Sequence, residues 1–317
     1  MYQNFFGLRE SPFNVNPDPR YLYMTRQAQE ALACLTYGIR TRKGFIVLTG
    51  EVGTGKTTLL NRLLDWLRND HVATAFIFNS RLSVPQVFDF IMADFGIACE
   101  SREKSQVLMR LNQWLLDRYK AGETAVLIID EAQNLSANVL EEIRLLTNLE
   151  TSTEKLLQIV LAGQPELEQK LSCPELRQLR QRVTLQSRTL PLTLEETVGY
   201  INERLRIAGA TDTGIFSAEA IQAVHHFARG IPRVTNLLCE HALISAFVDQ
   251  ERPVLRETVE RVAQEFRLDQ TEPAGQPMKK ENNGGDPVVS LLQNLARVLE
   301  QLKSEPEALE PARERKS

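Results

Sequence analysis

Residues 45–58 read FIVLTGEVGTGKTT, and the order of residue types in this stretch decides the fold class. It opens with a short, almost entirely apolar run, Phe45 to Thr49. Such a run is typical of a strand that is buried on both faces of a parallel sheet. A loop with three glycines comes next, and a helix is expected over residues 56–68. The stretch therefore predicts a strand, a tight loop and a helix in direct succession.

The same alternation of strand and helix continues to about residue 190. A second all-apolar strand is expected at residues 125–129, and Ser83 with Gln86 resembles a capping box that opens a helix. The remaining strands are expected at 73–78, 156–161 and 183–186, and the helices at 25–41, 83–95, 104–119 and 136–149. Short strands that alternate with helices predict an α/β fold with a mainly parallel sheet.

The pattern changes after Pro191, where predicted strands stop and four helices follow at 194–208, 217–229, 232–249 and 256–267. Composition changes again from Asp269, where Pro, Gly, Asn and charged residues dominate, as in a flexible linker. Residues 288–303 have the spacing of a short amphipathic helix. We therefore expect an N-terminal segment (1–40), an α/β core (41–190), an all-α domain (191–267), and a linker with a tail (268–317).

Composition narrows the class of protein. The 317 residues carry 37 Lys and Arg against 41 Asp and Glu, a formal net charge of −4, which argues against nucleic-acid binding by bulk charge alone. No apolar run approaches the 18 residues of a membrane-spanning helix, and no signal peptide is evident. The expectation is a cytoplasmic protein.

The glycine-containing loop carries the first chemical signal, because residues 50–57 fit G-x-x-x-x-G-K-[ST] between a predicted strand and a predicted helix. In such a loop, backbone N–H groups wrap phosphates and the lysine faces the β- and γ-phosphate oxygens. The hydroxyl of Thr57 can bind Mg²⁺. The predicted nucleotide-binding residues are Gly50, Glu51, Val52, Gly53, Thr54, Gly55, Lys56, Thr57 and Thr58, with ATP and Mg²⁺ as ligands.

Two adjacent acids, Asp130 and Glu131, end the apolar strand at 125–129. A carboxylate at this place can hold Mg²⁺, and its neighbour can orient the attacking water. We assign Asp130 to the metal and Glu131 to water activation. The alternative is an acidic N-cap for the next helix. The sequence has no N-K-x-D motif and no LSGGQ-like signature, which disfavours a GTPase and an ABC transporter subunit.

Several longer segments resemble the AAA+ ATPases of the general secretion pathway protein A (ExeA) type. They are FFGLRESPFNVNPDPRYLYMT, GFIVLTGEVGTGKTTLLNRLL, VLIIDEAQNLSANVLEEIRLLTNLET, LLQIVLAGQPELEQKL, LRQLRQRV and GIPRVTNLL, within residues 1–267. The resemblance implies a P-loop NTPase core with a C-terminal helical lid. It also implies a ring or helical homo-oligomer that shares its ATP sites.

The resemblance extends to residues that act on the γ-phosphate. Gln164 stands where such proteins have a sensor, although it could be a turn residue before Pro165. Asn79 fits a residue that holds the catalytic glutamate inactive, or a simple turn. Arg233 resembles the arginine that a lid helix presents in cis, the alternative being a solvated arginine.

A second group of residues completes the implied site. An arginine from a neighbouring subunit would neutralise transition-state charge, with Arg182 first choice among Arg177, Arg180 and Arg182. Some of these three must simply be solvated. Pro17, Tyr21 and Tyr23 are candidates to pack beside the adenine, although aromatic packing on the core explains any one of them.

Two roles for ATP turnover remain open, beside a nucleotide-gated scaffold with slow turnover, against which the intact Lys56, Asp130 and Glu131 argue. The first is assembly of a cell-envelope system such as secretion, pili or exopolysaccharide export, with a protein partner at residues 288–303. The relative that names the family has a transmembrane segment and a peptidoglycan-binding domain. This sequence shows neither, so we expect a cytoplasmic relative that reaches the inner membrane only through a partner. The alternative is a DNA-binding regulator of transposition, with Arg40, Arg42 and Lys43 or the three arginines at 177–182 on phosphates.

Overall fold

The computed structural model describes residues 1–14, 18–78, 81–100, 103–212 and 214–268, all within one compact unit that spans residues 1–270. The predicted linker and the helix at 288–303 lie outside the described residues. Within the part that is described, no helix combines the length and the apolar character needed to cross a bilayer. The domain boundaries expected at residues 40 and 190 stay predictions.

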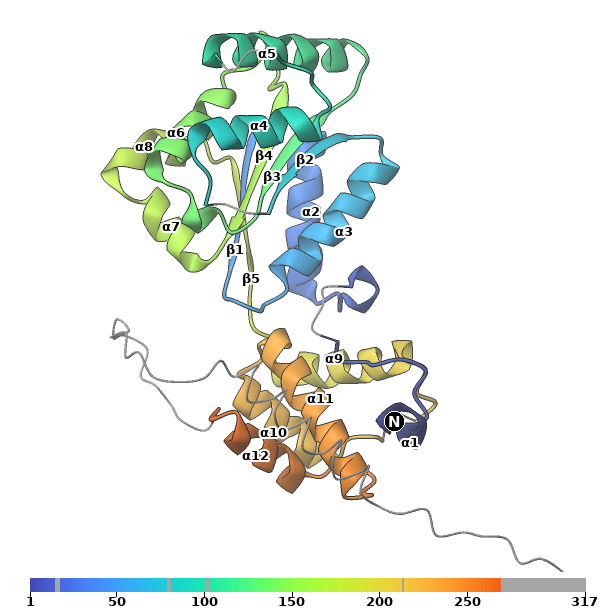
Figure 1. Ribbon diagram of the computed structural model, residues 1–317. Coiled ribbons are helices and arrows are strands. Elements are labelled where there is room, and N and C mark those ends of the chain that lie inside the picture. Colours follow the sequence, from blue (N-terminus) through green and yellow to red (C-terminus); the bar gives the residue numbers. More distant parts are fainter. Residues whose placement is uncertain (15–17, 79–80, 101–102, 213, 269–317) are drawn as a thin grey trace, which may run out of the picture. The chain divides into compact units, whose positions relative to one another are not determined.

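A five-stranded parallel sheet organises the first two thirds of this unit (Figure 1). Its strands in spatial order are β2 (Ala73–Ile77), β3 (Ala125–Ile129), β4 (Leu157–Gly163), β1 (Phe45–Gly50) and β5 (Leu185–Thr189). Every residue of β1, β3 and β4 is buried, which explains the continuous apolar runs in their sequences. The fold class predicted from the sequence is confirmed for this sheet.

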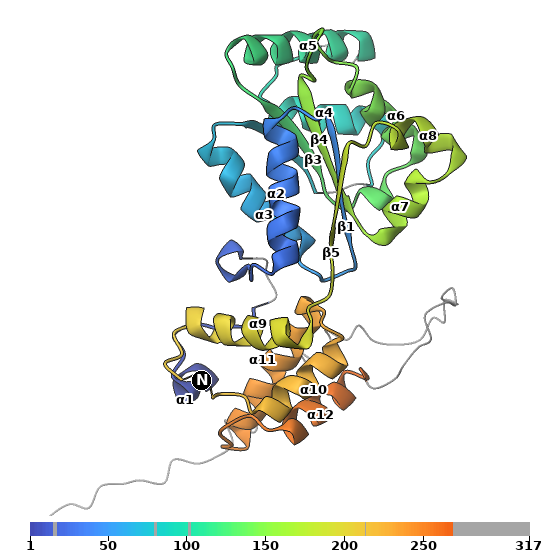
Figure 2. The same ribbon diagram turned by 180° about the vertical axis from the view of Figure 1, so that it is seen from behind.

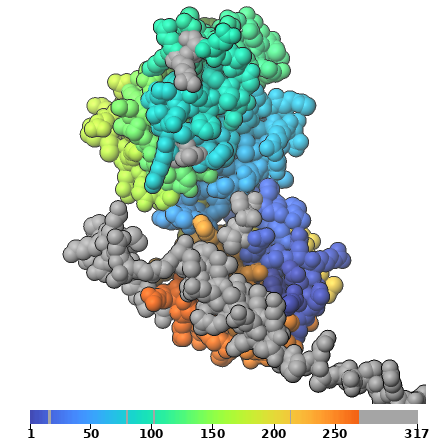
Figure 3. Space-filling model, in the orientation of Figure 1, coloured from blue at the N-terminus to red at the C-terminus, as the bar shows by residue number. Residues whose placement is uncertain are grey.

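Helices cover both faces of the sheet, and the alternating side chains of the strands divide into two hydrophobic clusters. On one face, Ile46 and Leu48 pack with α2 (Arg26–Arg40) and α3 (Lys56–Asn69). Figure 2 shows these two helices in front of the sheet. The other face packs against a larger set: α4 (Val84–Asp94), α5 (Lys104–Lys120), α6 (Ala137–Leu146), α7 (Pro165–Leu171) and α8 (Arg177–Arg180). The surface of α4 and α5 faces the viewer in Figure 3.

A third hydrophobic cluster belongs to the helical part. It joins α9 (Leu194–Ile207), α10 (Ala218–Ala228), α11 (Pro232–Val248) and α12 (Arg256–Glu265) with the short α1 (Tyr2–Phe6). Phe6 and Phe13 are buried in this cluster, so the chain's first residues pack with its last described helices. Short 3₁₀ helices lie at Pro19–Tyr21, Ala132–Asn134 and Pro174–Leu176.

Most element positions agree with the sequence prediction, and two differ for identifiable reasons. The helix expected to run to residue 149 ends at Leu146, where the Thr147 hydroxyl donates to the carbonyl of Arg144 and Lys155 Nζ donates to the carbonyl of Thr147. The last strand begins at Leu185, two residues later than expected. It is an edge strand with alternating burial, so its sequence has no apolar run.

Candidate functional site

The loop between β1 and α3 lies at the carboxyl edge of the sheet, and two of its glycines are required by geometry. Gly53 has φ 80° and Gly55 has φ 95°, in the left-handed region that side chains rarely adopt. A Cβ at Gly53 would also lie 2.8 Å from Cβ of Arg233. The backbone therefore turns tightly enough for its N–H groups to line a concave loop at the N-terminus of α3, which is an arrangement that binds anions.

Lys56 is the first residue of α3, and its side chain folds back over this loop. Its Nζ donates to the carbonyls of Gly50 at 2.7 Å and Glu51 at 2.9 Å, and the residue is only 5% exposed. Burial lowers the pKa of Lys56 from its ordinary value, while the carboxylates of Glu131 and Asp130 oppose that shift. A buried cation beside a loop lined by backbone N–H donors favours a ligand with several negative charges.

Thr57 and Asp130 meet although they stand 73 positions apart in the chain. Thr57 Oγ1 donates to Asp130 Oδ2 at 3.0 Å, and the backbone N–H of Glu131 donates to Asp130 Oδ1 at 2.9 Å. Asp130 is 5% exposed, and burial raises its pKa. A hydroxyl and a carboxylate oxygen at this separation are the hard ligands that Mg²⁺ prefers, so these residues fit the predicted metal.

Glu131 has φ 52°, and two glutamine amides hold its carboxylate. Nε2 of Gln164 donates to Glu131 Oε2 at 3.1 Å, and Nε2 of Gln133 donates to the same oxygen. The structure thus brings the predicted water-activating residue and the predicted sensor together. Gln133 was not among the residues expected from the sequence.

A cavity of about 440 Å³ opens beside the loop. Residues 52–59, Glu131 and Arg233 line one part of it, and Tyr21 and Tyr23 line another. Arg233 is exposed, and its backbone N–H donates to the carbonyl of Gly53 at 3.2 Å, which ties the start of α11 to the loop. The volume is within the range of pockets that bind cofactor-sized ligands. Pro17 and Asn79 lie outside the described residues.

Comparison with known proteins agrees with this geometry, because residues 39–171 match a family described as an AAA domain. The chain contains an AAA domain. Over 266 residues it is 43% identical to General secretion pathway protein A of Aeromonas hydrophila, a match that covers 84% of this chain. That match covers 48% of the relative, so the chain spans about half the length of the curated protein it matches.

Solved structures support the AAA+ P-loop fold. Cdc6p of Pyrobaculum aerophilum superposes with a TM-score of 0.61 at 19% identity, over 80% of this chain and 70% of that one. The ORC2 protein of Aeropyrum pernix, solved as ADPNP–ADP complexes, gives 0.60 at 14% identity, over 83% and 73%. At such identities the likeness concerns the fold alone.

The cavity also has a polar wall around Arg204, a residue that was not among those expected from the sequence. Arg204 is 6% exposed, and its guanidinium lies over the rings of Tyr21 and Tyr200 at 4.5 and 5.3 Å from their centroids. It donates to the Tyr200 hydroxyl at 3.0 Å, and that hydroxyl donates to Asn236 Oδ1 at 2.8 Å. Arg204 Nε also donates to the carbonyl of Pro12. The chain of bonds therefore joins α9, α11 and the N-terminal segment.

We expect Tyr200→Phe to lower the free energy of unfolding by about 1–3 kcal/mol, because it leaves Arg204 and Asn236 each with an unsatisfied buried group. Burial raises the pKa of Tyr200, so the hydroxyl is a donor at neutral pH. Urea unfolding followed by circular dichroism measures the change. Tyr37→Phe is the matched control, since Tyr37 is 55% exposed. Equal stability of the two variants would contradict the expectation.

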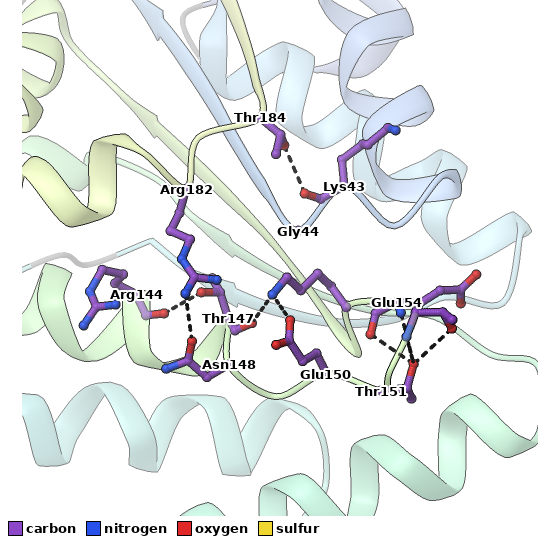
Figure 4. Close-up of polar contacts among 12 residues, drawn as sticks. Lys43, Gly44, Arg144, Thr147, Asn148, Glu150, Thr151, Glu154, Arg182 and Thr184 are labelled. Carbon is purple, nitrogen blue, oxygen red and sulfur yellow. Dashed lines mark hydrogen bonds and ion pairs between the residues drawn. The ribbon is translucent and has the colours of Figure 1, made fainter.

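Arg182 lies away from the loop of its own subunit. Thr184, two residues later, donates to the backbone carbonyl of Lys43 (Figure 4) and to that of Phe45, the first residue of β1. The loop, in contrast, follows the other end of that strand. The guanidinium of Arg182 donates to Asn148 Oδ1 at 3.2 Å (Figure 4). The side chains of Arg177 and Arg180 are exposed and make no hydrogen bond or ion pair with another described residue. None of the three arginines lines the cavity in its own subunit.

Proposed function

We propose that this protein binds and hydrolyses ATP with Mg²⁺. The observation that carries the proposal is the meeting of Lys56, Thr57 and Asp130 at the loop, with Glu131 on the wall of the same cavity. In the proposed complex the loop N–H groups and Lys56 hold the β- and γ-phosphates. Thr57 and Asp130 would hold Mg²⁺, which supplies charge neutralisation on the phosphates when bound.

Glu131 takes the proton of the attacking water in this mechanism, and Gln164 contacts the γ-phosphate. Arg233, at the start of α11, contributes a cation from the helical lid, and Tyr21 and Tyr23 of the N-terminal segment flank the adenine. Catalysis of this kind rests on positioning and on fixed charges rather than on a covalent intermediate. The direct test is phosphate release from ATP by the purified protein, with and without excess EDTA. No release in either condition would overturn the proposal.

The biological role that fits best is energising or regulating assembly of a cell-envelope system. The support is the 43% identity to General secretion pathway protein A across 84% of this chain. Residues 288–303 are the proposed attachment point for a protein partner of that system at the inner membrane. Loss of secretion, pilus or polysaccharide export after the Lys56→Ala substitution in the chromosome would support this role.

A DNA-dependent role is a distinguishable outcome. Two of the basic residues that could contact phosphates are already paired, since Arg40 binds Asp70 at 2.8 Å and Arg42 binds Glu154 at 3.3 Å. ATPase activity that DNA stimulates, with a steep dependence on salt, would favour regulation of transposition over envelope assembly. Unchanged activity with DNA at low salt would leave envelope assembly as the role.

If neighbouring subunits share each active site, a mixture of two inactive variants should regain ATPase activity. Arg182→Ala and Lys56→Ala subunits are each expected to be inactive, because each lacks one half of every site. An equal mixture should recover up to about one quarter of wild-type activity, since that share of interfaces joins an intact loop to an intact arginine. ATPase rates of the mixed proteins measure the recovery.

The control mixture contains Arg182→Ala and the double variant Lys56→Ala/Arg182→Ala, and it should stay inactive. Arg177→Ala and Arg180→Ala, mixed in the same way, identify which arginine acts across the interface. If no pair recovers activity while all variants remain folded, the proposal of a shared site is wrong.

A further inference from the structure

Gln133 connects the two residues to which the proposed function gives the central roles. It lies in the 3₁₀ turn Ala132–Asn134 that follows Glu131. Its Nε2 donates to Glu131 Oε2, and its Oε1 accepts the backbone N–H of Gln164 at 3.1 Å. The side-chain amide of Gln133 therefore donates to the Glu131 carboxylate and accepts from the backbone of Gln164, the predicted sensor.

The surroundings hold Gln133 in this position. Lys170, on α7, donates through Nζ to the backbone carbonyls of Gln133, at 2.9 Å, and of Leu135. The last residue of β4 is Gly163, and a Cβ built there would lie 2.7 Å from Gln133 Oε1. The glycine thus leaves the space that the amide fills. Both the backbone and the side chain of Gln133 are fixed by contacts across the loop.

The carboxylate of Glu131 needs such support. Glu131 has φ 52°, in a region that costs energy for any residue other than glycine. Contacts with other residues must therefore maintain the direction of the Glu131 side chain. Two amides share this task in the structure, because Gln133 and Gln164 both donate to Oε2. A Gln164 side chain that turns to a γ-phosphate gives up its bond to Glu131. Gln133 can keep its bond, because the acceptor end of its amide is held by the backbone of Gln164 rather than by the moving side chain.

We propose that Gln133 is a positioning residue that keeps the Glu131 carboxylate directed at the reaction centre while Gln164 changes partners. The inference rests on the proposed ATPase function and deepens it. Gln133 acts through Glu131 and does not itself contact the reacting atoms. Its removal should therefore affect the chemical step and leave nucleotide binding intact.

The test uses the isosteric change Gln133→Glu in the full chain. The new side chain keeps an acceptor for the Gln164 N–H but replaces the donor with an oxygen that repels Glu131. A displacement of about 1 Å in an active site can cost about 10²-fold, so we expect kcat to fall about 10- to 100-fold. The KM for ATP and the affinity for a non-hydrolysable ATP analogue should change less than about twofold, because the loop that binds the phosphates is untouched.

The pH profile of kcat gives a second readout that a purely structural role would not move. Two carboxylates side by side disfavour ionisation of both, so the acidic limb of the profile should shift to higher pH in Gln133→Glu. Gln133→Ala, which adds no charge, should lose activity without this shift. Asn134→Ala is the matched control, because Asn134 is exposed in the same turn and should show the wild-type rate and profile.

Gly163→Ala tests the geometry without altering Gln133 itself. The added methyl takes the place of the amide oxygen, and the nearest neighbour besides Gln133 is Leu167 Cδ2 at 3.1 Å. We expect a fall in kcat similar to that of Gln133→Ala. The double variant should lose little more than either single variant, because both changes remove the same contact. Thermal unfolding of each variant checks that the fold is retained.

The results separate this inference from the proposed function. An inactive wild-type protein overturns both. With an active wild type and folded variants, an unchanged kcat in Gln133→Glu, a loss confined to KM, or a rise in basal kcat overturns the role of Gln133 alone. A kcat loss with the shifted pH profile supports it.

Discussion

Lys56→Ala should abolish measurable ATP turnover and weaken nucleotide binding, with a loss in rate on the order of 10²–10³-fold or more. Among the described residues of the loop that line the cavity, Lys56 is the one with a positively charged side chain. Its Nζ lies 2.7 Å from the carbonyl oxygen of Gly50. Phosphate oxygens would replace the two loop carbonyls as its partners. Without it, the loop keeps its N–H donors but loses the charge that opposes the triphosphate.

The same substitution should leave the fold intact. Burial lowers the pKa of Lys56, which means that folding disfavours its charged form at neutral pH. The melting temperature without nucleotide should change little, because release from that desolvation offsets the loss of the Lys56 hydrogen bonds to the carbonyls of Gly50 and Glu51. The stabilisation that ATP gives to the wild type should disappear. Differential scanning fluorimetry and a phosphate-release assay measure the two effects.

Lys43→Ala is the control for charge removal, since Lys43 is an exposed lysine just before the start of β1. It should bind and hydrolyse ATP as the wild type does. Turnover by Lys56→Ala within about tenfold of wild type would show that the loop does not hold the triphosphate in the proposed way.

The parts of this site that could be predicted from the sequence are those whose residues are close together in the chain. The run from Phe45 to Thr57 predicts its strand, loop and helix without knowledge of the rest of the fold. A strand buried on both faces requires apolar residues, a loop with positive φ requires glycines, and contact with phosphate requires a lysine and a hydroxyl at the start of the helix. The pair Asp130 and Glu131 was found in the same way, from its place at the end of a buried strand. Gly53 shows the limit of this approach. Its positive φ follows from the motif, but its close approach to Arg233 follows only from the fold.

Contacts that depend on the order of the strands could not be predicted. The sheet places β4 between β3 and β1, and this brings Gln164 to Glu131 and Gln133. Gln133 has no signal of its own in the sequence, because a single amide after two acids could as well be solvated. Arg204 was missed for a related reason. A lone arginine in an amphipathic helix gives no sign that Tyr21 and Tyr200 will bury it.

Edge position explains why β5 was misplaced. An edge strand needs only one buried face, and the burial of β5 alternates along Leu185–Thr189. Arg188, the fourth residue of this strand, forms an ion pair with Glu168 on α7, and Glu168 also accepts a hydrogen bond from the hydroxyl of Thr49. The polar residues of β5, which give its sequence no continuous apolar run, thus bind the strand to the neighbouring elements.

Glu131→Gln should retain ATP and hydrolyse it on the order of 10²–10⁴-fold more slowly than wild type, because an amide cannot accept the proton of the attacking water. The substitution is isosteric, and its amide oxygen can still accept from the amides of Gln133 and Gln164. Asp130, Thr57 and Lys56 are unchanged, so binding of the triphosphate should be close to that of wild type. The ATP-bound state should accumulate.

Two measurements separate this outcome from simple inactivation. Nucleotide extracted from the protein after incubation should be mainly ATP for Glu131→Gln and mainly ADP for the wild type. Light scattering should show a larger share of oligomer in the variant, since ATP that is not consumed keeps a shared site closed. Glu175→Gln, a change at an exposed glutamate outside the cavity wall, should behave as wild type in both measurements. Turnover by Glu131→Gln within about threefold of wild type would assign the proton to another group, and the loss of bound ATP would instead place Glu131 in binding.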